Sequence, residues 1–131
     1  MKLQRDPVQI GFASSVKTIR ALAARLNDEL DNVSLARTEY PAEGLALLDV
    51  LALDANKSNS LEFLSDYVGI TLKETIAIGD NWNDLDMLEA AGRGVLMANA
   101  NDELKTKGFA ETSSNDEAGV AEAIHRYVLF D

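Results

Sequence analysis

The 131-residue chain contains no cysteine and few basic residues, and both shortages limit the binding sites that it can form. Without cysteine it can form neither a disulfide nor a thiolate metal site, which fits a reducing compartment, so we expect a cytoplasmic protein. Lys and Arg together number 12 against 22 Asp and Glu, which gives a formal net charge of −10. Binding to a nucleic-acid backbone needs clustered Lys and Arg, so this balance argues against a nucleic-acid partner.

Long hydrophobic runs are also missing. No stretch of 18 apolar residues occurs, so we expect no membrane span and no membrane partner. The opening residues, MKLQRDPVQIGF, lack the apolar segment of a signal peptide. What remains is an ordinary globular composition, 47% hydrophobic and 26% charged, long enough for one domain or one lobe with part of another.

Hydrophobic periodicity divides the chain into two parts. The first reads as strand, helix, strand, strand, and Ser14 or Ser15 can cap the helix. In the second part, helices alternate with short apolar strands at 75–79, 94–97 and 109–112. This alternation predicts an α/β fold with a parallel sheet and helices on both faces. We place the boundary so that the two parts are residues 1–54 and 55–131.

Two helices of the second part carry clear apolar faces. The helix at 58–69 places Leu61, Leu64 and Val68 on one side. For the closing helix, a capping box formed by Ser114 and Glu117 predicts the start. Its residues Val120, Ile124 and Val128 recur at helical spacing, so we expect them to face inward.

The stretch TIAIGDNWNDLDMLEAAGRGV, residues 75–95, carries the candidate chemistry. Asp80 directly follows an apolar strand, where ligands of parallel α/β sheets bind, and its carboxylate suits Mg²⁺. Asn83 carries an amide that can reach a phosphate oxygen, and the Asp84 carboxylate can hold a lysine or a metal-bound water. Lys57 begins a helix, whose N-terminus favours anions.

Each of these polar residues taken singly also has a plain structural explanation. Asp and Asn side chains routinely stabilise turns and cap helices, and a lone lysine is normally a surface residue. The group is more telling, because Gly79 precedes it and a helix follows it. Trp82 can either face the site or pack into the core, and the sequence leaves both open.

The longer motif GDNWNDLDMLEAAGRGVLMANANDELK resembles the C-terminal motif of the haloacid dehalogenase-like (HAD) phosphatases, in the Cof-type branch with a type IIB cap. The resemblance continues through FAETSSNDEAGVAEAI and back to DPVQIGF. It implies that residues 55–131 are the C-terminal part of a HAD Rossmannoid core lobe. Residues 1–54 are then the closing strand-helix-strand-strand part of an α+β cap.

The resemblance also implies a role for each candidate residue. Asp80 matches the family's Mg²⁺ ligand, and Asn83 matches the position that contacts the phosphoryl group. Asp84 matches the second acid, which supports the metal site and the lysine. Lys57 matches the lysine that stabilises charge on the phosphoryl oxygens, although Ser58 stands where the family commonly has Gly. The implied reaction is Mg²⁺-dependent hydrolysis of a small phosphorylated metabolite through an aspartyl-phosphate.

One family motif is absent from the sequence, the Asp-x-Asp-Gly-Thr that supplies the nucleophile and the general acid. Asp49 follows apolar residues, but Leu51 occupies the position of the second acid and no Gly-Thr follows. We therefore expect that Met1 starts inside the cap of a longer protein and that this chain alone is inactive. The strand at 75–79 would then have an open edge, which favours self-association.

Two other functions remain open from the residues alone. The chain can be a non-catalytic remnant that acts as a binding or oligomerisation module. A phosphorylatable receiver domain is a weaker alternative, because its acidic pair near the start and its phosphoacceptor Asp are not evident.

Overall fold

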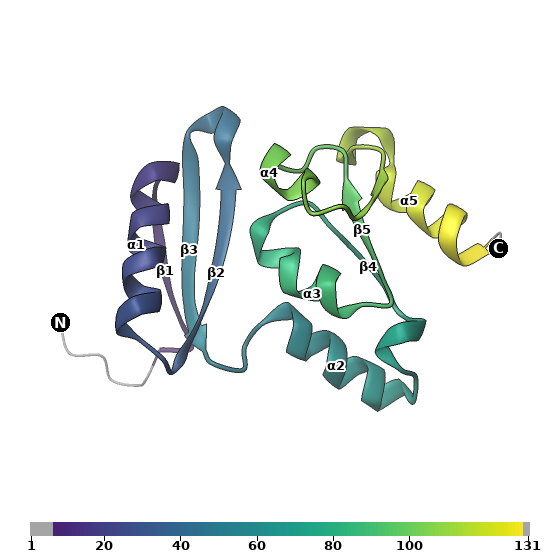
Figure 1. The fold of residues 1–131 in the computed structure, drawn as a ribbon, viewed down its shortest axis with the longest axis horizontal. Coiled ribbons are helices and arrows are strands. Elements are labelled where there is room, and N and C mark those ends of the chain that lie inside the picture. Colours follow the sequence, from purple (N-terminus) through teal and green to yellow (C-terminus); the bar gives the residue numbers. More distant parts are fainter. Residues whose placement is uncertain (1–6, 130–131) are drawn as a thin grey trace. The chain divides into compact units, whose positions relative to one another are not determined.

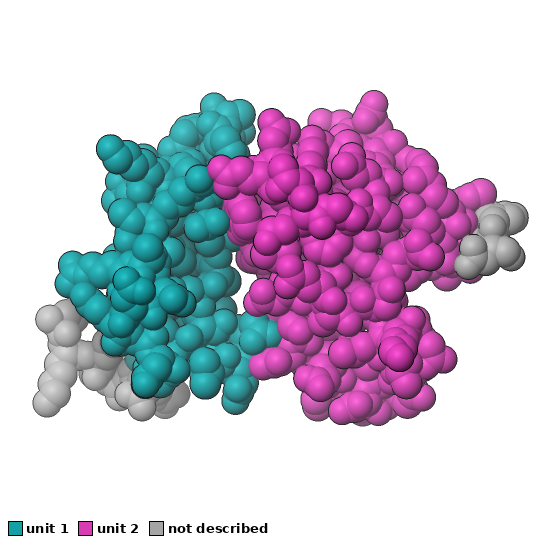
Figure 2. All heavy atoms as spheres, viewed as in Figure 1, with its two compact units in different colours: residues 1–56 teal, residues 57–131 magenta. Residues whose placement is uncertain are grey.

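The computed structural model describes residues 7–129 (Figure 1). The chain forms two compact units, residues 1–56 and 57–131, and Figure 2 colours them separately. The division falls two residues after the boundary that the sequence predicts.

Unit 1 is a three-stranded antiparallel sheet with one helix packed on it. Its strands stand in the order β1-β3-β2, so the last strand in the sequence is the central one. The predicted order of strand, helix, strand, strand is confirmed. The elements are β1 (Gln9–Ser15), α1 (Val16–Glu29), β2 (Val33–Tyr40) and β3 (Leu45–Ala52).

The core of unit 1 lies between α1 and the sheet. Ile19 of α1 is buried against Ala46 and Leu48 of β3, and further apolar residues of α1 and β2 surround them. Ser15 caps the helix by accepting a hydrogen bond from the Thr18 N–H at 3.3 Å. The predicted helix is thus confirmed, with Ser15 rather than Ser14 as its cap.

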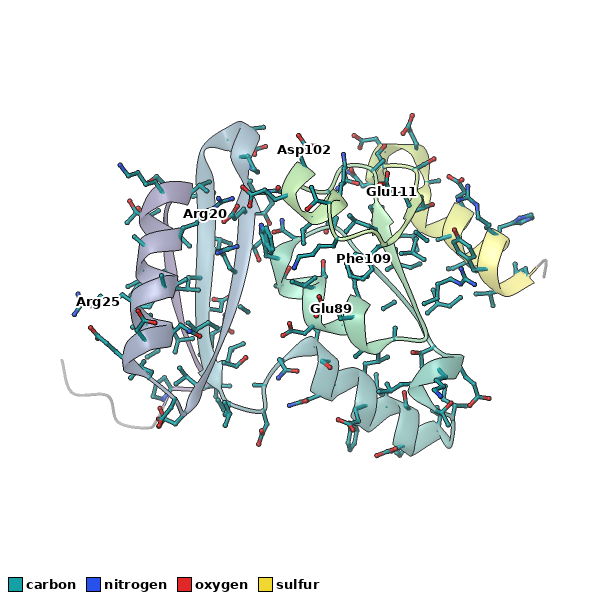
Figure 3. The ribbon with its side chains drawn as sticks, in the orientation of Figure 1. Arg20, Arg25, Glu89, Asp102, Phe109 and Glu111 are labelled. Carbon is teal, nitrogen blue, oxygen red and sulfur yellow. The ribbon has the colours of Figure 1, made fainter. Side chains whose placement is uncertain are left out.

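A buried ion pair adds a polar tie between α1 and β2. The Glu39 side chain is fully buried and binds Arg20 through two hydrogen bonds, from Nε at 2.8 Å and from Nη2 at 2.7 Å. Arg20 reaches it from α1 (Figure 3). Arg37 Nε also lies 3.0 Å from the Glu39 carboxylate. The paired cations keep this buried carboxylate from being left uncompensated.

Unit 2 is a three-stranded parallel sheet in the order β4-β5-β6. The predicted α/β fold with a parallel sheet is confirmed. Its helices and strands are α2 (Lys57–Val68), β4 (Ile76–Gly79), α3 (Leu85–Ala90), β5 (Arg93–Met97), α4 (Asp102–Lys105), β6 (Ala110–Thr112) and α5 (Gly119–Ile124).

Helices cover both faces of this sheet (Figure 1). On one face, Ala77 of β4 and Leu96 of β5 pack against Leu88 of α3, with Phe109, labelled in Figure 3, at the margin of the cluster. Side chains alternate along a strand, so Met97 points to the other face, where it lines a groove with α5 residues. The sheet is therefore held between α3 and α5.

The predicted inward face of α5 is wrong, and the apolar side of α2 is also largely exposed. Leu64 and Val68 of α2 are 54% and 61% exposed, and the buried residue of that helix is Ser65. Val120, Ile124 and Val128 are 45%, 41% and 58% exposed. Helical spacing correctly collects these residues on one side of each helix, but spacing cannot show whether another element covers that side.

Small residues explain why α5 turns a different side to the sheet. Its buried positions are Gly119 and Ala123. A Cβ atom at Gly119 would lie 1.9 Å from the Ser113 carbonyl oxygen, so only glycine permits this close approach. The predicted capping box of Ser114 and Glu117 is present, but it closes a 3₁₀ turn at Asn115–Glu117 that comes before the helix.

Glu122 fastens α5 to the end of β6. Its carboxylate accepts hydrogen bonds from the Ser113 hydroxyl at 2.5 Å and from the Ser113 N–H at 3.3 Å, and it pairs with Arg126. Arg126 in turn donates to the Glu111 carbonyl oxygen at 3.1 Å. The hydrogen bonds from Ser113, followed by the charge of Arg126, hold the pKa of Glu122 below its ordinary value, although desolvation acts in the opposite direction.

We predict that Glu122→Gln destabilises the chain at neutral pH. A folded-state pKa below the unfolded value means that ionised Glu122 stabilises the fold above the unfolded pKa, about 4.3. That stabilisation is lost as the pH falls through the folded-state pKa. The urea midpoint of Glu122→Gln should therefore lie below that of the parent chain at pH 7 and approach it in acid. Glu111→Gln, which removes an exposed carboxylate nearby, is the control; a deficit that persists unchanged in acid would contradict the prediction.

Candidate active site

Polar side chains gather in the loops that follow the three parallel strands of unit 2. Asp80 comes directly after β4, Asn99 comes two residues after β5, and Asn115 comes three residues after β6. Parallel strands end at the same edge of a sheet, so these loops are neighbours, and ligands of open α/β sheets bind at this edge. The predicted site therefore has a structural counterpart in unit 2.

Asp84 is the buried centre of the arrangement, with only 5% of its surface exposed. One carboxylate oxygen, Oδ2, accepts hydrogen bonds from the N–H groups of Asp80 at 3.0 Å and Asn81 at 3.1 Å. The other oxygen, Oδ1, forms an ion pair with Lys57 Nζ. Both oxygens are thus engaged by the protein itself, which offsets the cost of burying the charge.

The turn after β4 requires glycine at position 79. A Cβ atom there would lie 2.5 Å from the Cβ of Asp84 and 2.8 Å from its carboxylate carbon and Oδ2. The φ angle of Gly79 is not the reason, because it lies outside the left-handed region that favours glycine. Gly79 serves the site by leaving room for the Asp84 side chain under the strand end.

Lys57 lies at the first position of α2, as its predicted role requires. Its side chain is 48% exposed while that of its partner Asp84 is 7% exposed. The buried carboxylate therefore holds one end of the pair in place, and the ammonium group stays accessible to a ligand. Sequence reasoning paired these two residues, and the structure brings them into contact across 27 positions of the chain.

Asp80 is directed by a residue that sequence reasoning missed. Asn99 Nδ2 donates a hydrogen bond to Asp80 Oδ2 at 2.9 Å, and Asn99 Oδ1 accepts one from the Asn115 N–H at 2.9 Å. A signal for Asn99 was present, because it follows a parallel strand at the same edge as Asp80. It lies 19 positions from Asp80, and nothing in the local pattern pairs the two.

Asn83 and Trp82 share one 3₁₀ turn, Trp82–Asp84, and differ in what they contact. Trp82 packs against the core of unit 2, which decides between the two alternatives that the sequence left open for it. Asn83 is partly exposed, and within residues 7–129 its side-chain amide forms no hydrogen bond. The amide is therefore available to a ligand, as a phosphate-binding role requires.

The donor set fits Mg²⁺ through one carboxylate. Across residues 7–129 no three His, Asp or Glu side chains form a cluster suited to a metal ion. Asp84 is engaged through both oxygens, while Asp80 Oδ1 accepts no hydrogen bond from any other residue in the described range. Mg²⁺ commonly uses only one or two protein carboxylates and completes its shell with water and phosphate oxygens. Asp80 is therefore the residue of this chain that would hold it.

A groove of about 620 Å³ opens beside Asp80 on the α5 side of the sheet. Its walls are mostly apolar and include Met97, Val120 and Ile124, while Asp80 and Asn115 bring polar groups to its rim. The groove explains where the exposed side chains of α5 lie. They border the candidate site rather than fill the core.

Among residues 7–129, no helix has both the length and the apolar character needed to cross a membrane.

Taken together, the site consists of a buried carboxylate with its lysine, a second carboxylate with one available oxygen, and a free amide. Such a set suits binding of a phosphoryl group together with a divalent cation.

Comparison with known proteins identifies the family. A family model described as haloacid dehalogenase-like hydrolase matches residues 1–124. The chain therefore belongs to the haloacid dehalogenase-like hydrolases, a family of phosphatases. The predicted branch also agrees with the comparisons, because several relatives are phosphatases and one solved neighbour is a HAD subclass IIB sugar phosphatase.

Particular relatives give the extent of the similarity. A protein of Haemophilus influenzae is 36% identical over 117 residues, which are 89% of this chain and 43% of the relative. A 5-amino-6-(5-phospho-D-ribitylamino)uracil phosphatase of Bacillus subtilis is 44% identical over 80 residues, 61% of this chain and 28% of that protein. The solved structure of a HAD subclass IIB sugar phosphatase aligns with a TM-score of 0.74 and 25% identity, covering 94% of this chain and 44% of that one. The chain thus spans less than half the length of these relatives.

We predict that Asp84→Asn destabilises unit 2. The substitution removes the charge that pairs with Lys57 and weakens the acceptor of two backbone N–H groups, and each poorly satisfied buried group costs about 1–3 kcal/mol. Asp86→Asn is the matched control, because it removes the same charge from an exposed position two residues further along, in the first turn of α3. It should change the unfolding free energy by no more than about 0.5 kcal/mol. Equal losses for the two variants in urea titrations would show that the buried Asp84 has no special role.

Proposed function

We propose that this chain supplies the metal- and phosphate-binding part of a HAD phosphatase that acts on small phosphorylated metabolites. The observation that carries the proposal is the Lys57–Asp84 ion pair, joined through the backbone of the turn to Asp80 at the carboxyl edge of the sheet. In this proposal unit 2 is the C-terminal part of the core lobe. Unit 1 is the closing part of a type IIB cap.

The four site residues divide the work of phosphoryl transfer. Lys57, held by Asp84, offsets negative charge on the phosphoryl oxygens, and the Asn83 amide donates a hydrogen bond to one of them. Asp80 would hold Mg²⁺ through the oxygen that Asn99 leaves available. The metal ion would neutralise charge on the transferring phosphoryl group and help to orient it. Asp84 acts through Lys57 and the turn and does not itself touch the substrate.

The nucleophile of the proposed reaction comes from a segment outside these 131 residues. Its aspartate would form a bond to phosphorus as the bond to the leaving oxygen breaks, and water would then hydrolyse the aspartyl-phosphate. This sequence contains no Asp-x-Asp-Gly-Thr. Asp49 is not a substitute, since it lies in β3 of unit 1 and accepts a hydrogen bond from Gln9 Nε2 at 2.6 Å.

The proposed substrate class follows from the relatives and from the charge of the site. One relative is a phosphatase for a phosphorylated ribitylaminouracil, and one structural neighbour is a sugar phosphatase. A small phosphorylated metabolite also suits a site with one lysine and one metal carboxylate. With a formal net charge of −10, the chain offers little attraction for larger polyanions.

We predict that this chain is inactive alone and is rescued in trans. The partner is an N-terminal lobe of a type IIB phosphatase that carries Asp-x-Asp-Gly-Thr. Once binding of the two chains is shown by sedimentation, the complex should hydrolyse an aryl phosphate in a Mg²⁺-dependent way, since the lobe supplies the nucleophile. In the complex, Lys57→Ala should lower the rate by about a hundredfold, roughly 3 kcal/mol, by removing charge stabilisation.

Two controls separate this result from contamination and from general damage. Lys107→Ala removes an exposed lysine away from the site and should leave the rate unchanged. Asp80→Asn should weaken the dependence on Mg²⁺. A bound and folded complex without activity, or full activity after Asp80→Asn, would refute the assignment of these residues.

The alternative function is a non-catalytic module that binds or oligomerises, and one feature favours it. β4 is an outer strand of its sheet, and among the described residues its other edge has no strand partner. In the same unit, α2 exposes Phe63, Leu64, Tyr67 and Val68, at 68%, 54%, 80% and 61%. Open strand edges and contiguous apolar surface both promote association.

We predict that the isolated chain self-associates through the β4 edge. Sedimentation velocity should show a dimer that dissociates on dilution. Ile78→Lys should shift it to monomer, because a charge on an edge strand opposes pairing with a second strand. Glu111→Lys adds a lysine to the opposite edge strand, β6, and should leave the dimer intact. A parent chain that stays monomeric at high concentration would mean that the edge does not pair with a second copy.

A further inference from the structure

Asn99 connects all three loops at the carboxyl edge of the parallel sheet. Its Nδ2 donates to Asp80 Oδ2 in the loop after β4, at 2.9 Å. Its Oδ1 accepts from the Asn115 N–H in the loop after β6, also at 2.9 Å. Asn99 itself follows β5, so a single exposed side chain bridges the loops on both sides of it.

The bridge requires an amide, because one end must donate and the other must accept. Alanine offers neither function, and aspartate can accept from Asn115 but cannot donate to Asp80. An amide that is bonded at both ends has a fixed orientation. The carboxylate that it contacts is therefore restrained as well.

The far end of the bridge is itself anchored. The loop that carries Asn115 is closed by Ser114, whose hydroxyl donates to Glu117 at 2.8 Å. One residue earlier, Ser113 binds Glu122 of α5 through its hydroxyl and its N–H. Asn99 thus restrains Asp80 against a loop with its own set of hydrogen bonds, and not against a free segment.

We infer that Asn99 is a positioning residue that fixes the Asp80 carboxylate so that Oδ1 alone coordinates a divalent cation, favouring Mg²⁺ over Ca²⁺. The inference rests on the proposed function, in which Asp80 is the Mg²⁺ ligand. Oδ2 is engaged by Asn99, whereas Oδ1 accepts no hydrogen bond from residues 7–129. Mg²⁺ takes single oxygens in a strict octahedron, while Ca²⁺ readily accepts both oxygens of one carboxylate. Loss of the hydrogen bond from Asn99 to Asp80 should therefore raise the affinity for Ca²⁺ relative to that for Mg²⁺.

The test measures metal binding by the full chain and needs no catalysis. Mn²⁺ is added to ¹⁵N-labelled protein, and the initial slope of paramagnetic broadening is measured for the amides around Asp80. This slope reports relative affinity even where occupancy is low. Exposed carboxylates of unit 1, such as Asp28 and Asp31, provide internal reference slopes. Mg²⁺ and Ca²⁺ are then added in separate titrations to displace Mn²⁺. The apparent affinities of the two ions are obtained from the loss of broadening, and their Ca²⁺ to Mg²⁺ ratio is recorded.

We expect Asn99→Ala to lower the Mn²⁺ slope at Asp80 by about tenfold, the lower end of the effect of residues that orient metal ligands. The Ca²⁺ to Mg²⁺ ratio should rise, and the slopes at the reference carboxylates should not change. Asn99→Asp keeps the acceptor for the Asn115 N–H but loses the donor to Asp80, so the ratio should rise there too. Asn115→Ala is the matched control, since it removes an amide side chain but keeps the N–H that binds Asn99; it should behave like the parent chain.

Each other outcome overturns a defined statement. If Asp80→Asn leaves the broadening unchanged, Asp80 is not a metal ligand, and the proposed function fails together with this inference. If Asp80→Asn abolishes the broadening but Asn99→Ala does not alter it, only the positioning role fails. If Asn99→Ala lowers the affinities for Mg²⁺ and Ca²⁺ equally, Asn99 merely holds the loop and the inference is overturned. The same conclusion follows if the Ca²⁺ to Mg²⁺ ratio changes in Asn99→Ala but not in Asn99→Asp.

Discussion

The candidate site depends on the burial of one charge, the carboxylate of Asp84. A buried carboxylate is costly unless it is fully paired, and here one oxygen accepts two backbone N–H groups while the other pairs with Lys57. These contacts join the end of β4 to the start of α2 through a residue at the start of α3. The turn must then bring the backbone of residues 80 and 81 over the carboxylate, and this is the approach that excludes a Cβ atom at Gly79.

This arrangement gives two carboxylates four residues apart opposite roles. Asp84 is occupied by the protein, so its charge sets the position of the turn and of Lys57. The side chain of Asp80 lies outside that network, and only its backbone N–H takes part. Its carboxylate is bound on one oxygen by Asn99 and remains available on the other. Local hydrogen bonding, rather than a difference in residue type, separates the structural acid from the ligand-binding one.

The sequence predicted those features that local chemistry determines. A cap at Ser14 or Ser15, the parallel strands of unit 2 and the pairing of Lys57 with Asp84 follow from short patterns and from the family motif. Burial was predicted less well, because an apolar face such as that of Val120 and Ile124 shows only that some cover is favourable. Whether a cover exists depends on elements that lie elsewhere in the molecule or outside it.

Asn99 was missed for a related reason. Its two partners lie 19 and 16 positions away, and they meet only because three parallel strands end at one edge. No periodicity reports such a contact. A useful rule would have been to collect every polar residue that follows a predicted parallel strand, since strand order alone brings those residues together.

The position of Asp80 on an outer strand links the chemistry of the site to the stability of the sheet. Ligands in parallel α/β sheets bind between the loops of neighbouring strands. Asp80 has such a neighbour on the β5 side, where Asn99 lies, and none among the described residues on the other side. The edge that leaves β4 without a backbone partner is therefore also the side on which the site lacks ligands. A strand added there would satisfy the backbone of β4 and place its own carboxyl end beside Asp80. In the proposed phosphatase, one segment would thus complete the sheet and the catalytic site together.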